Sequence, residues 1–218
     1  MTNSDPTQGI VLYHGGRRWV GKPEIRAPYS GKAEYGPGLY FTNSAETAAK
    51  YAKGSNVITK VVLDPGLRWL HEAGLLALPA LEAAVEQFPR IGQAARDGLL
   101  RDLRRNAQRR DTDWIRPEVL INLMVNAGLV NGERALAVAR WLTEQGIDAS
   151  LNQVNGNLPG YEDWVVVSNP AVILSHEVVS RKDIDWANPF LPGVRTQLEA
   201  FQDEESSGTS YRATAMCP

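Results

Sequence analysis

Three separate segments carry side chains that can act together chemically: an imidazole at His14, a phenol at Tyr40 and adjacent carboxylates at Glu162 and Asp163. An imidazole hydrogen-bonds a hydroxyl group, and an aromatic face stacks on a planar ring. A carboxylate stabilises positive charge that develops in a transition state, or takes a proton from an acceptor. This combination of groups suits the cleavage of a bond between a planar ring and a sugar.

Each of these side chains belongs to a segment that is typical of a β-strand. The run from Ile10 to His14 is apolar and stops at two glycines, and Tyr40 lies in the aromatic run 39–42. The two carboxylates come directly before Trp164–Val167, a run rich in β-branched residues. We therefore expect three strands to deliver the three kinds of side chain.

The central segment runs from Tyr35 to Ala52 and predicts a turn, a strand and a helix in succession. Gly36-Pro37-Gly38 favours the turn, and Asn43 or Ser44 is a suitable N-cap for a helix from Ala45. Tyr51 falls near the end of that helix, eleven residues after Tyr40. On its own this segment is also compatible with an ordinary strand–helix corner whose aromatic residues fill the core.

Taken in order, the three segments resemble the ADP-ribosyltransferases of the diphtheria-toxin and poly(ADP-ribose) polymerase type, whose motif is His-Tyr-Glu. The resemblance covers roughly residues 10–64 and 147–180. It implies an α+β fold, with a split β-sheet core around a cleft for NAD. NAD would act there as a co-substrate that donates ADP-ribose.

The resemblance also implies roles for individual residues. His14 corresponds to the histidine that hydrogen-bonds a ribose hydroxyl, and Gly15 to the glycine whose backbone pairs with the nicotinamide carboxamide. Tyr40 corresponds to the tyrosine that lies along the nicotinamide, and Tyr51 to a second stacking tyrosine. The expected NAD-binding set is completed by three neighbouring positions: Gly16, Phe41 and Ala48.

Two of these positions depart from the polymerase pattern. The polymerases have a serine where this chain has Gly16, and a serine that bonds the carboxamide where it has Ala48. Each missing hydrogen bond is worth roughly 1 kcal/mol, so we expect weaker NAD binding in a pocket of the same shape. The departures also agree with a non-enzymatic binding module whose pocket has decayed.

The third motif leaves two candidates for the catalytic carboxylate. A gapless match places Asp163 in the catalytic position, whereas residue type favours Glu162, because an aspartate is one methylene shorter. Adjacent strand residues face opposite sides of a sheet, so only one of the two can point into the cleft. A bulge after Gly160 would turn Glu162 inward.

The rest of the chain divides around this core. A strand at Val57–Leu63 ends at an Asp-Pro-Gly turn, and residues 67–146 have apolar residues at helical spacing. We expect helices at 75–88, 94–108, 116–127 and 132–145, and further strands at 147–154 and 171–179. The predicted core is thus 10–66 with 147–186, and 67–146 is an inserted helical subdomain. We expect residues 1–9 to be disordered and residues 187–218 to be largely disordered.

The helical region is rich in arginine and contains a nearby tryptophan. A cationic patch with an aromatic residue is compatible with a nucleic acid, although a solvated helix face has the same composition. The patch also suits a protein acceptor or an inhibitory partner such as an antitoxin. The residues that we consider for acceptor binding are Arg104, Arg105, Arg109, Arg110 and Trp114.

Composition restricts the remaining possibilities. The chain has 218 residues, a net charge of −2 and 43% hydrophobic residues, which is typical of a globular protein with no global attraction to nucleic acid or membrane. Cys217 is the single cysteine, so we expect no disulfide framework, no thiolate metal cluster and no metal in the site. The polar start lacks a secretory pattern, and we expect a cytoplasmic protein.

The sequence therefore predicts an NAD-dependent mono-ADP-ribosyltransferase of the toxin or anti-phage defence kind. The arginines slightly favour a nucleic acid as the acceptor, with a protein side chain close behind. An NAD glycohydrolase on the same scaffold, with water as the acceptor, is the main alternative.

Overall fold

The computed structural model describes residues 9–26, 33–128, 132–154 and 162–213, with side chains up to residue 203. The prediction for residues 1–8 and that for residues 214–218 fall outside this part of the chain. The fold is α+β, as expected, and is built on an antiparallel six-stranded sheet with the strand order β6-β7-β2-β1-β3-β8. The strands are β1 (Ile10–Gly16), β2 (Leu39–Thr42), β3 (Val57–Leu63), β6 (Ala149–Val154), β7 (Glu162–Val167) and β8 (Ile173–Val179).

The pairing between neighbouring strands is shortest between β1 and β2. β1 pairs with β3 along its whole length, from Ile10 opposite Leu63 to Gly16 opposite Val57. By contrast, β1 and β2 are in register at Tyr13 and Thr42 alone. The sheet therefore consists of two halves, β8-β3-β1 and β2-β7-β6, joined at a seam where the two central strands separate.

Alternation along the strands gives each face of the sheet its own buried cluster. One cluster contains Leu12, Phe41 and Val165, and the first turn of the C-terminal helix α6 (Val194–Ala213) packs on it through Val194. On the other face, Ile58 packs against α1 (Ala45–Tyr51). Of the two residues expected as N-cap, Asn43 and Ser44, it is Ser44 whose hydroxyl accepts the backbone N–H of Thr47 at 3.2 Å.

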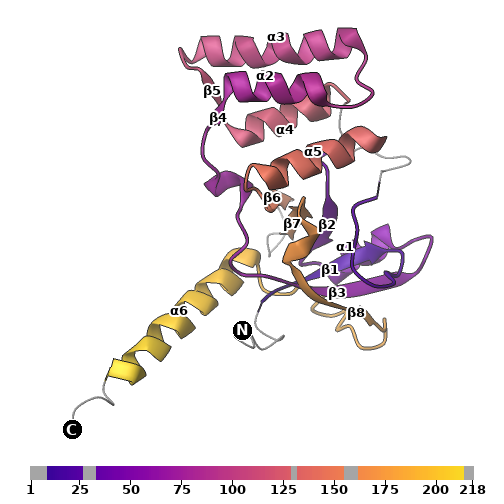
Figure 1. Ribbon diagram of the computed structural model, residues 1–218. Coiled ribbons are helices and arrows are strands. Elements are labelled where there is room, and N and C mark those ends of the chain that lie inside the picture. The colour runs from indigo at the N-terminus through magenta and orange to yellow at the C-terminus, as the bar shows by residue number, and fades with distance from the viewer. Residues whose placement is uncertain (1–8, 27–32, 129–131, 155–161, 214–218) are drawn as a thin grey trace.

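The helices between β3 and β6 form a block with a buried cluster of their own. They lie together above the sheet in Figure 1. The block contains α2 (Leu78–Gln87), α3 (Gln93–Arg109), α4 (Pro117–Asn126) and α5 (Gly132–Glu144), preceded by a short 3-10 turn, η1 (Leu70–Glu72). A two-stranded ribbon of β4 (Leu76–Ala77) and β5 (Trp114–Ile115) ties α2 to the segment after α3.

Several element boundaries differ by one to three residues from the sequence prediction, and two of these differences have a clear local cause. The helix expected from Leu75 begins at Leu78, because Pro79 occupies its first turn, where a missing N–H costs nothing. The strand expected from Ala171 begins at Ile173, after a 3-10 turn, η2 (Pro170–Val172), in which the side chain of Asn169 accepts the N–H of Ala171.

The prediction that residues 187–218 are largely disordered is wrong for the segment that forms α6. The acidic and Ser-rich composition suggested a disordered tail, but Val194 is fully buried, and Leu198 and Phe201 pack against the same cluster at helical spacing. α6 starts against the sheet and leads away from it (Figure 1). Within the described residues, no helix has both the length and the apolar character that a membrane span requires.

Candidate active site

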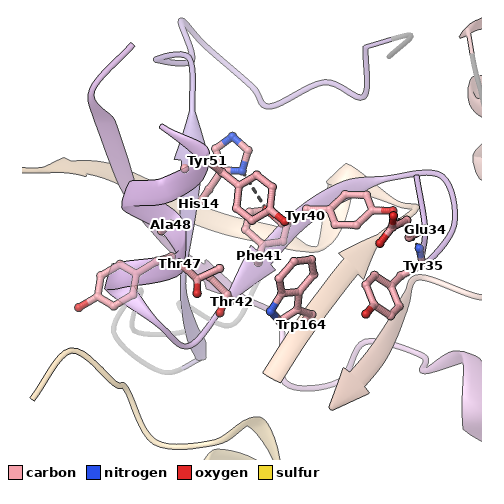
Figure 2. Close-up of a pocket in the computed structure, with 12 residues that line it drawn as sticks. His14, Glu34, Tyr35, Tyr40, Phe41, Thr42, Thr47, Ala48, Tyr51 and Trp164 are labelled. Carbon is pink, nitrogen blue, oxygen red and sulfur yellow. Dashed lines mark hydrogen bonds between the residues drawn. The ribbon is translucent and has the colours of Figure 1, made fainter. Parts of the chain in front are cut away.

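A cavity of about 420 Å³ opens at the seam between β1 and β2, beside α1. Figure 2 shows its lining residues, which come from β1, the turn before β2, β2, α1 and β7. Most of the expected NAD-binding residues meet here, together with aromatic residues that the sequence analysis did not select. The lining residues are Tyr13, His14, Gly15, Glu34, Tyr35, Tyr40, Phe41, Thr42, Thr47, Ala48, Tyr51 and Trp164.

His14 spans the seam. Its Nδ1 lies 2.9 Å from the carbonyl oxygen of Tyr40, and its ring stacks on Trp19 with 4.5 Å between centroids. Because a carbonyl only accepts hydrogen bonds, Nδ1 carries the proton of the neutral imidazole. Burial lowers the pKa of His14, and the hydrogen bond to Tyr40 opposes this shift in part. The neutral ring therefore offers Nε2 as an acceptor for a hydroxyl group.

Close packing explains both glycines after His14, against backbone at Gly15 and against a side chain at Gly16. A Cβ on Gly15 would lie 1.7 Å from the carbonyl oxygen of Ala48, so this glycine lets α1 approach β1. A Cβ on Gly16 would lie 2.4 Å from Nε2 of His14. Gly16 does not line the cavity, but its lack of a side chain leaves the imidazole in place. Ala48 lines the cavity and is buried.

The turn before β2 fixes the position of Tyr40. Its hydroxyl donates to the carbonyl oxygen of Gly36 at 2.7 Å and accepts the N–H of Tyr35 at 3.3 Å. The other side of the turn contacts the helical block, since a Cβ on Gly36 would lie 3.1 Å from Ile121. Burial, mainly, and then the charge of Glu34 raise the pKa of Tyr40. The ring is thus a neutral aromatic wall held by its hydroxyl group.

Tyr51 lies at the open side of the cavity. It is 64% exposed, and its ring meets the ring of Trp164 edge to face at 5.6 Å. Burial raises its pKa, and the carboxylates of Glu34 and Glu162 add to this shift. On the far side of Trp164, Tyr35 makes a second edge contact at 5.4 Å. The mouth is therefore lined by aromatic rings within the field of two carboxylates.

Glu162 is the acidic residue on the cavity side of β7. Its Oε1 accepts the indole N–H of Trp164 at 2.6 Å and the hydroxyl of Thr42 at 3.1 Å, and both partners line the cavity. Because Glu162 and Trp164 are two residues apart on one strand, they share a face of the sheet. The pairing of β7 with β6 and β2 is regular over 162–167, and ordinary alternation places Glu162 on this side. The bulge expected after Gly160 lies outside the described residues.

Asp163, the other candidate for the catalytic acid, points away from this cavity. It is 3% exposed, and its Oδ2 accepts the N–H of Val194 at 2.7 Å, at the first turn of α6. Its own N–H donates to the side-chain oxygen of Asn43 at 2.9 Å. The gapless alignment placed Asp163 in the catalytic position, but the alternation of the strand assigns it to anchoring α6.

The arginines considered for acceptor binding do not reach the cavity. α3, which carries them, is the outermost helix of the block in Figure 1, and no α3 residue lines the cavity. Arg104 pairs with Glu82 at 2.7 Å, and Arg105 lies 3.7 Å from Asp102. Trp114 is part of the β5 ribbon. Arg109 and Arg110 lie at the C-terminal end of α3.

Several cavity residues were missed because their positions depend on packing between distant segments. Trp164 directly follows the two carboxylates in the sequence, and alternation from Glu162 predicts that the two share a face of the strand. Tyr35 and Glu34 are brought in by the turn, which no spacing rule specifies. Thr47, next to Ala48, was overlooked because its role as a helix residue is unremarkable in the sequence.

Within the described residues, no group of three or more His, Cys, Asp or Glu side chains is arranged to hold a metal ion. The chain matches no family model, no curated protein and no solved structure. The function of the site is therefore inferred from its geometry and from the motif resemblance.

Proposed function

We propose that this protein is a mono-ADP-ribosyltransferase that cleaves NAD at the bond between nicotinamide and ribose. One observation carries the proposal: His14 and Tyr40 line a single aromatic cavity, and Glu162 hydrogen-bonds two further lining residues, Thr42 and Trp164. The division of the sheet into two halves at this cavity also agrees with the split sheet that the resemblance implies.

The lining residues fit the nicotinamide end of NAD. The ring of Tyr40 is held by its hydroxyl group, and Tyr51 lines the open side of the same cavity, so both aromatic rings are available to stack on a planar ring. Neutral His14 offers Nε2 to a ribose hydroxyl. Thr47 lies next to Ala48 in the lining, and its hydroxyl is available in place of the serine that the polymerases carry at the latter position.

Glu162 supplies the negative charge. When the bond breaks, both electrons leave with the nicotinamide nitrogen, and positive charge develops on the anomeric carbon of the ribose. A carboxylate beside that carbon lowers the barrier, because the interaction is strongest in the transition state. The acceptor then forms the new bond with its own electron pair, and its proton passes to Glu162 or to solvent. Hydrogen bonds from Trp164 and Thr42 fix the carboxylate for this task.

Hydrolysis of NAD is the second candidate reaction. The exposure of Tyr51, at 64%, leaves the mouth open to water, which is itself a nucleophile. In that case free ADP-ribose would accumulate without any labelled macromolecule.

Incubation of the protein with NAD labelled in its adenylate part, in a cell lysate, separates these reactions. We expect acid-precipitable label and released nicotinamide in equal amounts with wild-type protein. Tyr40→Ala should abolish both, because the aromatic wall is lost. Treatment of halves of the product with protease and with nuclease identifies the acceptor class. Release of nicotinamide without precipitable label would favour hydrolysis, and no release would contradict the proposal.

A further inference from the structure

A second, smaller cavity adjoins the proposed active site. It has a volume of about 90 Å³ and shares Glu34 and Tyr35 with the larger cavity. Its other walls come from the helical block and from β6, so it lies where the block meets the sheet. Neither the motif resemblance nor the proposed chemistry assigns a role to this position.

The lining of the second cavity combines an aliphatic surface with an acidic rim. Leu70, Ile121 and Leu151 provide the apolar part, and the carboxylates are those of Glu34 and Glu118. Among the described residues that line it there is no Lys or Arg, and the one histidine, His71, lies 3.8 Å from Glu72.

Both carboxylates are available for a ligand. Within the described part of the chain, neither Glu34 nor Glu118 takes part in a hydrogen bond or an ion pair. A long basic side chain places its methylene groups on apolar surface and its charged end beside carboxylates. An arginine or lysine side chain therefore matches this cavity in both of its parts.

We infer that the second cavity is a specificity subsite that binds a basic side chain of a polypeptide acceptor, close to the residue that receives ADP-ribose. This inference rests on the proposed function. Tyr35 separates the two cavities, and its ring meets Trp164, which hydrogen-bonds Glu162. A peptide that places a basic residue in the subsite thus crosses Tyr35 and presents a neighbouring residue toward Glu162.

The same surface disfavours a nucleic acid. Phosphates would meet the carboxylates of Glu34 and Glu118 beside the site, whereas nucleic-acid sites are lined by cations. The arginines that suggested a nucleic acid belong to α3 and its C-terminal end, and α3 is the outermost helix of the block in Figure 1.

The test uses a degenerate peptide library, labelled NAD and the full chain, with sequencing of the labelled peptides. Wild-type protein should enrich arginine or lysine within a few positions of the labelled residue. Glu118→Lys reverses the charge of the rim, so it should remove this enrichment and favour Asp and Glu instead. Its labelling of basic peptides should fall by about tenfold, while nicotinamide release in the absence of peptide stays within about twofold. Glu118→Gln, a milder change, should show a weaker loss of the preference.

Glu144→Lys is the matched control, because Glu144 is an exposed acidic residue of α5 that lines neither cavity. It should leave the peptide preference unchanged. An unbiased wild-type library, an unchanged preference in Glu118→Lys, label on nucleic acid alone, or nicotinamide release without any labelled peptide would each overturn the subsite. No nicotinamide release by wild-type protein would instead overturn the proposed function itself, and the subsite with it.

Discussion

Glu162 and Asp163 are neighbours in the chain but serve opposite faces of the sheet. The carboxylate of Glu162 is held by Trp164 and Thr42 at the cavity, and that of Asp163 by the first turn of α6 on the far side. Strand alternation thus separates two acidic residues that the sequence left equivalent. Their substitution should have effects of different kinds.

Glu162→Gln should lower kcat by about a hundredfold or more, because the amide cannot stabilise positive charge or take a proton. Stability should change little, since the amide oxygen still accepts from Trp164. Asp163→Ala should instead lower the free energy of unfolding by about 1–3 kcal/mol, because the buried N–H of Val194 loses its acceptor. Measurements of denaturant unfolding and of initial rates on both variants check this division between a catalytic and a structural carboxylate. Similar activity losses at equal stability would contradict it.

Two substitutions of Tyr40 should separate the contribution of its aromatic ring from that of its hydroxyl group. Tyr40→Phe keeps the ring and loses the hydrogen bond to the carbonyl of Gly36, at a cost of about 1 kcal/mol in stability. We expect its activity to remain within about tenfold of wild type, since that cost corresponds to less than a factor of ten. Tyr40→Ala should be inactive at any NAD concentration. Comparison of nicotinamide release by the two variants is the measurement, and equal rates would argue against the stacking role.

Substitutions of Gly15 and Gly16 should also differ in whether they affect stability or activity. Gly15→Ala places a methyl group against the backbone of Ala48, which no rotamer change relieves, and should cost about 1–3 kcal/mol or more in stability. Gly16→Ser introduces the residue that the polymerases carry, yet its Cβ would contact Nε2 of His14. We therefore expect Gly16→Ser to fold and to lose activity. Thermal unfolding with parallel activity assays distinguishes the two, and a gain of activity in Gly16→Ser would contradict the proposed orientation of His14.

The pH dependence of activity should follow the protonation of His14. Burial lowers its pKa below the usual value of 6.5, so the imidazole is neutral at pH 7 and accepts a ribose hydroxyl. Activity should therefore be flat near neutral pH and fall in a window below pH 6.5. The stability that depends on neutral His14 is fully present above pH 6.5. It is lost as the pH falls, because the unfolded state binds the proton more readily.

A profile of kcat/KM against pH for wild type and for His14→Gln checks this prediction. The variant should be less active and should lack the acid limb that His14 contributes. If the variant loses activity at acid pH with the same midpoint as wild type, the acid limb belongs to a group other than His14.

The parts of this molecule that follow local rules were predictable. The strand around Tyr40 and the cap at Ser44 depend on neighbours in the sequence, and the structure has them as expected. The hydrogen-bonded turn before the strand lies earlier than predicted, with the N–H of Gly36 donating to the carbonyl oxygen of Ala33. The choice between Glu162 and Asp163 required strand pairing, because a shift of one residue exchanges the two faces. α6 was missed because its order depends on burial of Val194 against a sheet that is distant in sequence. The stacking of Trp19 on His14 likewise joins a loop to a strand end.

Quantification of nicotinamide released from NAD by wild type and by Glu162→Gln, under single-turnover conditions, tests the central claim most directly. We predict release by wild type at a rate at least about a hundredfold above the variant, with both proteins equally folded. Absence of release from wild type, or equal release from the two proteins, would contradict the account.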